Sequence, residues 1–154
     1  EEVLERAREA GVTRFLAICD RFDNFESVLA IARSHEDIWC SAGVHPHHAK
    51  DFPDLTVETL IQAASNPEVV AIGETGLDYF YKHSNIEIQK TFLKRYLRLA
   101  LLTELPVIFH CREAFDDLFA GFMILWVVTL GSNFLIIYIY IYIYIYIYIL
   151  FLLI

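Results

Sequence analysis

Short apolar runs alternate with amphipathic segments along the first 119 residues of the chain. The apolar runs are rich in β-branched and aromatic residues and are bounded by polar loops, which is typical of buried strands. They lie at residues 12–19, 38–44, 69–73 and 106–110. Hydrophobic residues at helical spacing predict helices over residues 1–10, 25–34, 56–65 and 86–104, and a further helix that begins at residue 113. This alternation predicts a parallel sheet with helices outside it.

Single residues refine these predicted elements. Thr56 has a side chain that caps helices well and is expected to begin the third helix. The second helix is expected to bury Val28, Leu29 and Ile31. Residues 74–85 are mainly polar and aromatic, and they are expected to form a long loop after the third strand.

The four predicted βα units are compatible with two architectures. One is half of a (β/α)8 barrel, and the other is an open doubly wound sheet. No GxGxxG motif follows any of the predicted strands, which disfavours a dinucleotide-binding sheet. The pattern by itself leaves both architectures open.

Polar side chains follow three of the four predicted strands. The second strand is followed by His45 and His47, the third by Glu74, and the fourth ends in His110 and Arg112. In parallel α/β folds, catalytic groups are built at the carboxyl ends of the strands. A glutamate and a histidine from neighbouring strands can share one divalent ion. These residues are therefore candidates for a metal site.

Each candidate also has an ordinary structural interpretation. Glu74 could be a solvated loop acid or a helix cap, and His110 a hydrogen-bonded core histidine. Arg112 could form only a surface ion pair, and His45 and His47 could be loop histidines. Nothing in the spacing alone decides between these interpretations.

The residues after Glu74 allow two interpretations as well. Asp78 suits either turn formation or the support of a neighbouring ligand. The aromatic residues 79–81 suit either a packed loop, which we favour, or a wall for a base or sugar. His35, His48 and His83 are expected to be surface residues.

Charge is distributed very unevenly along the chain. All 12 basic and all 20 acidic residues lie before residue 118, so the net charge of −8 belongs to this part alone. An acidic surface argues against an extended basic stripe along a nucleic-acid backbone. It does not exclude an enzyme in which metal ions neutralise a single phosphate. Cys19, Cys40 and Cys111 form no CxxC motif, which favours a reducing compartment.

At these strand ends the sequence resembles the TatD family of metal-dependent deoxyribonucleases. The resemblance covers about residues 1–119 and implies a (β/α)8 barrel that hydrolyses DNA phosphodiester bonds with two divalent metal ions, such as Mg²⁺, Mn²⁺ or Zn²⁺. The matching segments are SAGVHPHHAK (41–50), VVAIGETGLDYFY (69–81), QKTFLKRYLRLA (89–100) and LPVIFHCREAFDD (105–117).

The resemblance also implies a role for each candidate residue. Glu74 is expected to bridge the two metal ions, and His110 is expected to be a metal ligand. Arg112 is expected to contact the substrate phosphate, which a guanidinium can bind through two hydrogen bonds. His45 and His47 are expected to lie near that phosphate.

The sequence departs from the family pattern in ways that put activity in doubt. The pattern has an HxH pair on the first strand, whereas His45-Pro46-His47 follows a different strand. The pattern also supplies a later histidine and aspartate, but neither residue type occurs after Asp117. Only the second to fifth βα units match, and the chain begins inside a predicted helix without methionine. We therefore expect a truncated, inactive nuclease that lacks a preceding segment.

The last part of the chain has a different composition. Residues 118–154 carry no charged side chain, and isoleucine and tyrosine alternate almost perfectly over residues 137–149. A membrane-spanning helix over residues 134–154 would be long enough, but tyrosine prefers membrane interfaces. A strand is favoured by the alternation, although both its faces would be hydrophobic.

A third interpretation of this tail is that it is not evolved protein. ATA encodes isoleucine and TAT encodes tyrosine, so translation of a TA repeat in non-coding DNA produces this alternation. We favour this interpretation and place the boundary near Ala120. In the folded chain, residues 137–149 are then expected to form an isolated helix or strand with few contacts to the rest.

Taken together, we predict an α/β fold that is a partial (β/α)8 barrel. Residues 1–119 form a partial TatD-like hydrolase domain, and residues 120–154 form a hydrophobic tail. The predicted substrate is DNA; the alternatives are a barrel amidohydrolase that acts on a small molecule and a tail-anchored, non-catalytic membrane module. The body is expected to be soluble, in the cytoplasm or an organelle, and a membrane is a partner only if the tail at residues 134–154 is genuine.

Overall fold

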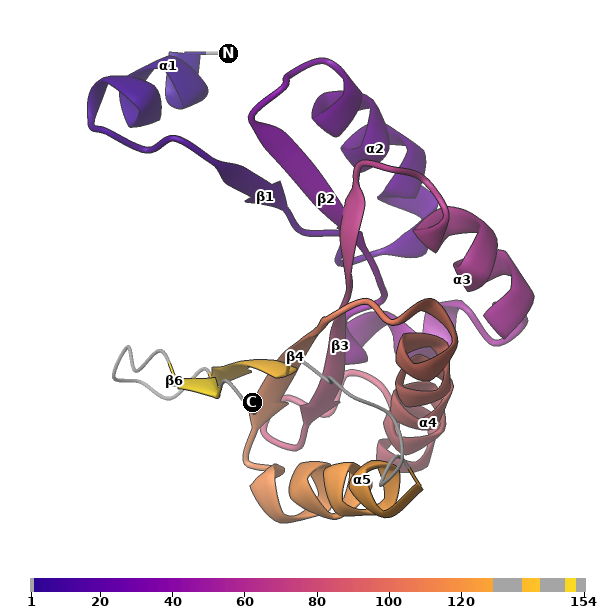
Figure 1. Cartoon of the computed structure of the whole chain (residues 1–154). Helices are drawn as coiled ribbons and strands as arrows, with labels where there is room; N and C mark the ends of the chain where they lie inside the picture. Colours follow the sequence, from indigo (N-terminus) through magenta and orange to yellow (C-terminus); the bar gives the residue numbers. More distant parts are fainter. Residues whose placement is uncertain (1, 129–136, 142–148, 152–154) are drawn as a thin grey trace.

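The computed structural model describes residues 2–128, 137–141 and 149–151 of the chain (Figure 1). Its strands form one sheet in the order β1-β2-β3-β4-β5-β6. These strands are β1 (Phe15–Ala17), β2 (Ile38–Ala42), β3 (Val69–Asp78), β4 (Val107–Arg112), β5 (Ile137–Ile141) and β6 (Ile149–Phe151). The α-helices are α1 (Glu2–Glu9), α2 (Phe25–Arg33), α3 (Val57–Ala64), α4 (Ile86–Thr103) and α5 (Phe115–Val128). Two 3-10 helices, η1 (Phe22–Asn24) and η2 (Pro46–Asp51), lie between them.

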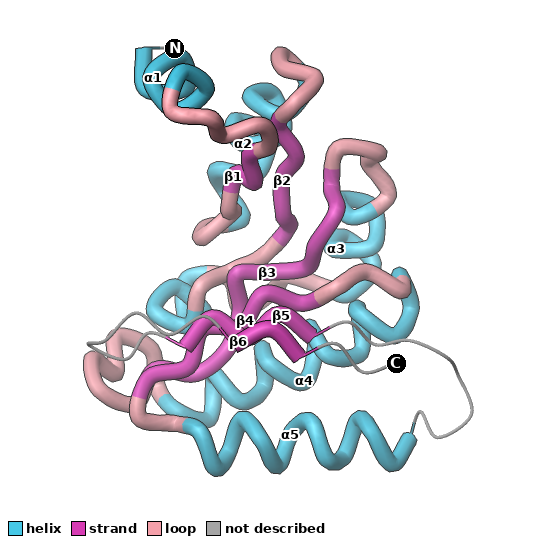
Figure 2. Tube along the Cα trace, turned by 60° about the vertical axis from the view of Figure 1, so that its left-hand side comes forward, coloured by secondary structure: helices cyan, strands magenta, loops and turns pink. Residues whose placement is uncertain are grey.

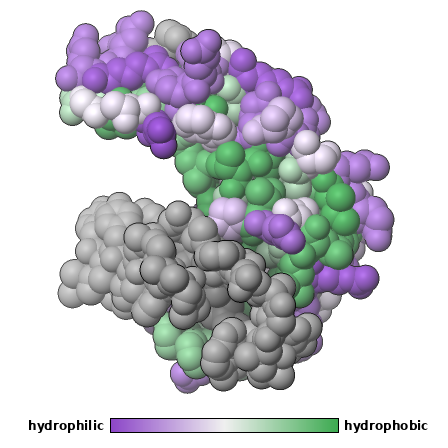
Figure 3. All heavy atoms as spheres, viewed as in Figure 1, coloured by the Kyte–Doolittle hydropathy of each residue, from purple (hydrophilic) through white to green (hydrophobic). Residues whose placement is uncertain are grey.

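The first four strands are parallel neighbours, as predicted. Helices α2, α3 and α4 lie on one side of them, and the strands turn progressively in space as half of a barrel does (Figures 1 and 2). Hydrophobic residues gather on the hollowed side of the molecule, over its centre (Figure 3). The α/β half-barrel prediction is confirmed, and the open doubly wound sheet is not formed.

Strand β3 is twice as long as the apolar run that predicted it. Residues 74–78 belong to the strand rather than to the predicted loop, and they pair with β4 through Thr75↔Phe109 and Gly76↔His110. The reason is a close approach of the two backbones: a Cβ built on Gly76 would lie 2.0 Å from the carbonyl oxygen of His110. Glycine is typical of turns when only the sequence is considered, but here the missing side chain lets the two strands pair closely.

The helices follow the sequence pattern with one error. Thr56 caps α3 as predicted, because its Oγ1 accepts a hydrogen bond from the backbone N–H of Thr59 at 3.2 Å. Helix α2, however, leaves Ile31 48% exposed and buries Phe25, Leu29 and Ala32. The buried face is rotated relative to the prediction because Phe25, Leu29 and Ala32 pack into the core cluster beside β2.

The tail differs from the expectation of an isolated segment. Strand β5 pairs in parallel with β4, in the register Val107↔Ile137 to Cys111↔Ile141. The few-contacts prediction is therefore wrong for residues 137–141, because an alternating Ile/Tyr strand can satisfy the hydrogen-bonding groups on the edge of β4. Residues 142–148 of the repeat lie outside the described residues. Helix α5 runs on to Val128, past the predicted domain boundary after residue 119, which stays a prediction.

Among the described residues, no helix combines the length and the apolar character needed to cross a membrane. The predicted span at residues 134–154 lies mostly outside the described residues, and its described parts are strands β5 and β6.

All three cysteines are buried free thiols, as expected for small core residues. Burial raises the pKa of Cys40 from its ordinary value of 9.0 to about 11. Burial also raises the pKa of Cys19 and of Cys111. Each folded-state pKa lies above the unfolded value, so these thiols favour the folded state fully below about pH 9 and progressively less above it.

We therefore expect the native thiols to resist modification. At pH 8 only about a thousandth of Cys40 would be thiolate, the reactive form, and access to it is closed. Native protein mixed with a disulfide reagent such as Ellman's reagent should show almost no colour, whereas protein in guanidinium should release three equivalents. Rapid reaction of any thiol in the native chain would contradict this burial.

Candidate metal and phosphate site

A cavity of about 450 Å³ lies at the carboxyl ends of the central strands. It brings together the five candidate metal-site and phosphate-site residues that the sequence singled out, although they lie up to 67 positions apart. Its lining consists of Ile18, His45, His47, Glu74, Asp78, Tyr81, Ile108, His110 and Arg112. Three neighbouring strands therefore direct carboxylate, imidazole and guanidinium groups at one volume.

His45 is fixed by the turn that it begins. It is the N-cap of η2, Pro46 occupies the first position, and His45 Nδ1 accepts a hydrogen bond from the backbone N–H of His47 at 3.2 Å. Burial, followed by the nearby His110 and His47, lowers the pKa of His45 to about 3. His45 is thus a neutral imidazole at physiological pH, with its proton on Nε2.

A chain of hydrogen bonds runs from His45 to Asp78. His45 Nε2 lies 3.0 Å from His110 Nδ1, so His45 donates and His110 Nδ1 accepts. His110 then carries its proton on Nε2, 2.9 Å from Asp78 Oδ2. His47 Nε2 lies 2.9 Å from the same oxygen. One carboxylate oxygen therefore orients two histidines that come from different parts of the chain.

Asp78 is completely buried and has a third donor. Its Oδ1 accepts a hydrogen bond from the backbone N–H of Tyr81 at 2.8 Å. Burial acts to raise the pKa of Asp78, but the hydrogen bonds from Tyr81, His47 and His110 outweigh it and hold the pKa below its ordinary value. Both functions that the sequence left open for Asp78, turn formation and support of a neighbour, are present.

Two buried polar residues that the sequence did not single out, Gln89 and Ser84, hold Asp78 and His47 in place. Gln89 Oε1 accepts from the Asp78 backbone N–H at 2.7 Å, and Gln89 Nε2 donates to the carbonyl oxygens of Asp78 and Ser84. Ser84 Oγ donates to the His47 carbonyl oxygen at 2.8 Å. The one signal in the sequence was a glutamine on the apolar face of the longest helix, at a position that the structure buries fully.

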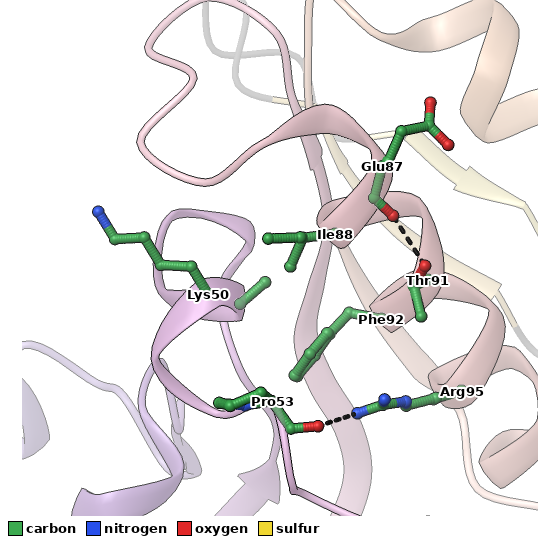
Figure 4. Close-up of a pocket in the computed structure, with 8 residues that line it drawn as sticks. Lys50, Pro53, Glu87, Ile88, Thr91, Phe92 and Arg95 are labelled. Atoms are coloured by element: carbon green, nitrogen blue, oxygen red, sulfur yellow. Dashed lines mark hydrogen bonds between the residues drawn. The ribbon is translucent and has the colours of Figure 1, made fainter.

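A second, smaller cavity of about 270 Å³ lies between η2 and α4 (Figure 4). At its edge, Arg95 donates to the carbonyl oxygens of Pro53 and Leu55 at 3.3 and 3.0 Å and lies 4.9 Å above the Phe92 ring. This cavity contains none of the residues predicted to carry chemistry. Arg95 instead ties the segment after η2 to α4, which steadies the turn that carries His45 and His47.

Arg112 lies at the rim of the larger cavity against two aromatic rings. Its guanidinium carbon is 4.1 Å from the centre of the Phe80 ring and 4.5 Å from that of Tyr81. Stacking on aromatic faces holds the planar guanidinium in one orientation at the cavity. A cation in this position favours an anion in the cavity.

Comparison with known proteins identifies the family. The model of the TatD related DNase family matches residues 1–123 of the chain. The chain belongs to the TatD family. The TatD match continues a few residues beyond Phe119, where the resemblance in the sequence was expected to end.

The chain matches about half of the length of individual TatD proteins. A 3'-5' ssDNA/RNA exonuclease TatD of Erwinia tasmaniensis is 43% identical over 117 residues, which cover 75% of this chain and 45% of that protein. The protein of the same name from Shigella flexneri is 37% identical over 116 residues, with the same coverage. The chain thus spans about half the length of the curated relatives it matches.

Solved structures agree with the TatD assignment. The crystal structure of a TatD homologue from Escherichia coli K12 superposes with a TM-score of 0.74 at 35% identity, covering 79% of this chain and 48% of that one. An uncharacterized amidohydrolase from Saccharomyces cerevisiae superposes with a TM-score of 0.67 at 23% identity, covering 79% and 43%, and shows the shared fold alone.

Proposed function

We propose that the larger cavity is the metal-binding and phosphate-binding part of a nuclease that hydrolyses phosphodiester bonds in DNA, and in RNA as well. The observation that carries this proposal is the convergence of His45, His47, Glu74, His110 and Arg112 on one cavity at the carboxyl ends of β2, β3 and β4. The names of the TatD relatives, which describe exonucleases acting on ssDNA and RNA, support the same substrate class.

The residues present fit a divalent metal ion. His110 Nδ1 lies 3.4 Å from Glu74 Oε1, and two atoms bound to one ion at about 2.1 Å lie about 3–3.5 Å apart. Asp78 holds Nε2 of His110, so a metal ion would bind at Nδ1 and replace the hydrogen bond that His45 donates there. In the proposed site, Glu74 and His110 would be the ligands that hold two divalent ions, either Mg²⁺, Mn²⁺ or Zn²⁺, with Glu74 shared between them.

A three-histidine site is the other way to hold an ion in this cavity. Ligand atoms of His45, His47 and His110 all lie within 4.8 Å of one another. However, His47 Nε2 is engaged by Asp78, and His45 Nδ1 accepts from a backbone N–H. We therefore assign His45 and His47 to the substrate phosphate, and we expect alanine at His47 to spare metal binding.

When bound, divalent ions would activate water and stabilise negative charge on the phosphate. Side chains of the protein would bind the phosphate and orient the metal ligands. Arg112 would contact the phosphate oxygens, and a metal ion bound at His110 Nδ1 would release for the same phosphate the His45 Nε2–H, which donates to that nitrogen in this structure. Asp78 keeps His47 and His110 in their orientations throughout.

We also propose that residues 1–154 by themselves do not turn over substrate efficiently. Within this sequence the family pattern places only Glu74 and His110 as metal ligands. Two protein ligands can hold an ion weakly but leave most of its coordination to water. Binding of metal and of nucleic acid should therefore be measurable where cleavage is not.

The test uses the purified chain. Titration with Mn²⁺ in a calorimeter should show saturable binding, and a fluorescein-labelled single-stranded oligonucleotide should bind more tightly with Mn²⁺ than with EDTA. Metal-dependent cleavage that disappears in Glu74→Ala would overturn the inactivity while supporting the nuclease. A chain that binds neither metal nor oligonucleotide would overturn the proposed site.

Removal of the Asp78 carboxylate should weaken metal binding without removing a ligand. In Asp78→Asn the two histidines lose their shared acceptor, and metal affinity should fall about 10–100-fold, as for other groups that orient metal ligands. Mn²⁺ titration monitored by electron paramagnetic resonance measures this. Asp54→Asn, an exposed aspartate outside the cavity, is the control, and equal affinity of the two variants would contradict the role of Asp78.

A further inference from the structure

The loop between β3 and α4 has an unusual tip. Four consecutive side chains, those of residues 80–83, are exposed, and they are two aromatic rings, a lysine and a histidine. Phe80 is 50% exposed and Tyr81 49% exposed. Loop tips usually carry small polar residues, because exposed aromatic surface lowers solubility and stabilises nothing. Two half-exposed rings in a row therefore indicate a surface for a ligand.

The tip is displayed on a firmly held base. The Tyr81 backbone N–H is bound by Asp78, and at the other end Ser84 is buried and hydrogen-bonded to His47 and Lys50. The buried Gln89 side chain links the two ends, because it binds the carbonyl oxygens of Asp78 and Ser84. The rings are thus preorganised, which reduces the entropy lost when they bind a partner.

The Tyr81 ring is oriented by its neighbours and lines the cavity. It meets Phe80 and His47 edge-on, with centroids 4.8 and 5.5 Å away, and lies parallel to His83 at 5.5 Å. Two of these contacts are edge-on and the His83 contact is parallel, and Tyr81 still keeps about half of its surface exposed. The Arg112 guanidinium lies 4.5 Å from the ring centre.

Two cationic residues accompany the rings. The Arg112 guanidinium lies over both of them, and Lys82 follows Tyr81 directly in the chain. Aromatic faces interleaved with cations are the combination that binds single-stranded nucleic acid, where bases stack on rings and phosphates meet the cations. Bases in a duplex are not available for such stacking.

We infer that Tyr81, with Phe80 beside it, is a stacking platform for an unpaired nucleobase next to the phosphate that Arg112 binds. This inference rests on the proposed function and names its substrate more closely: a single strand with a base adjacent to the bound phosphate. Tyr81 binds that base through the exposed part of its ring, and the base extends the parallel Tyr81–His83 stack, so the platform accepts any of the four bases.

The test compares two probes by fluorescence anisotropy in the presence of Mn²⁺. One is fluorescein-labelled single-stranded hexathymidylate, and the other is the same oligomer with abasic sites at its central positions; gels confirm that both stay intact. The unaltered chain should prefer the base-bearing oligomer about 5- to 100-fold. Tyr81→Ala should lose this preference, and Tyr81→Phe should keep it.

The matched control is Phe119→Ala, which removes an equally exposed ring outside the cavity and should keep the preference. If Tyr81→Ala weakens the binding of both probes equally, Tyr81 acts only through Arg112 and the stacking platform is overturned. If the unaltered chain binds both probes equally well, the platform is overturned while the phosphate site stands. If it binds neither probe, the proposed function itself fails. Thermal unfolding followed by circular dichroism confirms that the variants are folded.

Discussion

Replacement of Glu74 by glutamine is expected to reduce the affinity of the chain for divalent metal by about 100-fold or more, a larger loss than for groups that only orient ligands. The amide has almost the same shape as the carboxylate but carries no charge, and it can offer only one oxygen. Glu74 Oε1 is the atom that lies 3.4 Å from His110 Nδ1 at the proposed metal position. Without that charge, His110 alone cannot hold an ion.

Calorimetric titration of both proteins with Mn²⁺ measures this loss. Glu58→Gln is a suitable control because Glu58 is exposed in the first turn of α3 and does not line the cavity. The control should bind Mn²⁺ as the unaltered chain does. A Glu74→Gln protein that retains full metal affinity would show that the histidines hold the ion, as in the alternative three-histidine arrangement.

Replacement of Gly76 by alanine is expected to destabilise the fold by about 3 kcal/mol or more, in the range reserved for backbone conflicts. The added Cβ would lie 2.0 Å from the carbonyl oxygen and 2.9 Å from the carbonyl carbon of His110, and neither atom can move without separating β3 from β4. In addition, Gly76 has a φ of +141°, which side-chain-bearing residues rarely adopt. The two penalties act on the same central strand pair.

Gly11→Ala separates these two penalties. Gly11 also has a positive φ, of +92°, but a Cβ there would have no neighbour within 4 Å. The Gly11→Ala substitution should therefore lower the free energy of unfolding by only about 1–2 kcal/mol, because of the backbone conformation alone. Urea unfolding of the three proteins gives the comparison, and the prediction fails if Gly76→Ala is no less stable than Gly11→Ala.

The sequence predicted the convergence of the site better than the extent of its strands. Glu74 and His110 could be placed near one another because the ends of neighbouring parallel strands meet at one edge of a sheet. The extension of β3 through residues 74–78 could not be predicted, because Gly73 and Gly76 are typical of turns until a partner backbone is present. Pairing with β4 is a tertiary effect that overrides local preference.

The residues that orient the proposed ligands could not be predicted from the sequence for a similar reason. The hydrogen bonds of Gln89 to Asp78 and Ser84 depend on the path of the intervening loop, which nothing in the residue pattern specifies. The tail shows the opposite case. The strand character of residues 137–141 was visible in the alternation, but its partner was not, because the free edge of β4 becomes apparent only once the sheet is built.

The contacts made by glycine have a consequence for sequence variation. A Cβ on Gly43 would lie 2.1 Å from the Gly73 backbone, and one on Gly76 would lie 2.0 Å from that of His110. The backbones at the end of β2, in β3 and in β4 therefore approach closely at these glycines. These glycines bear no chemistry, yet they set how closely the side chains of β2, β3 and β4 approach one another. Among relatives, Gly43 and Gly76 should consequently vary as little as Glu74, and a search for catalytic positions based on invariance alone would select spacers together with ligands.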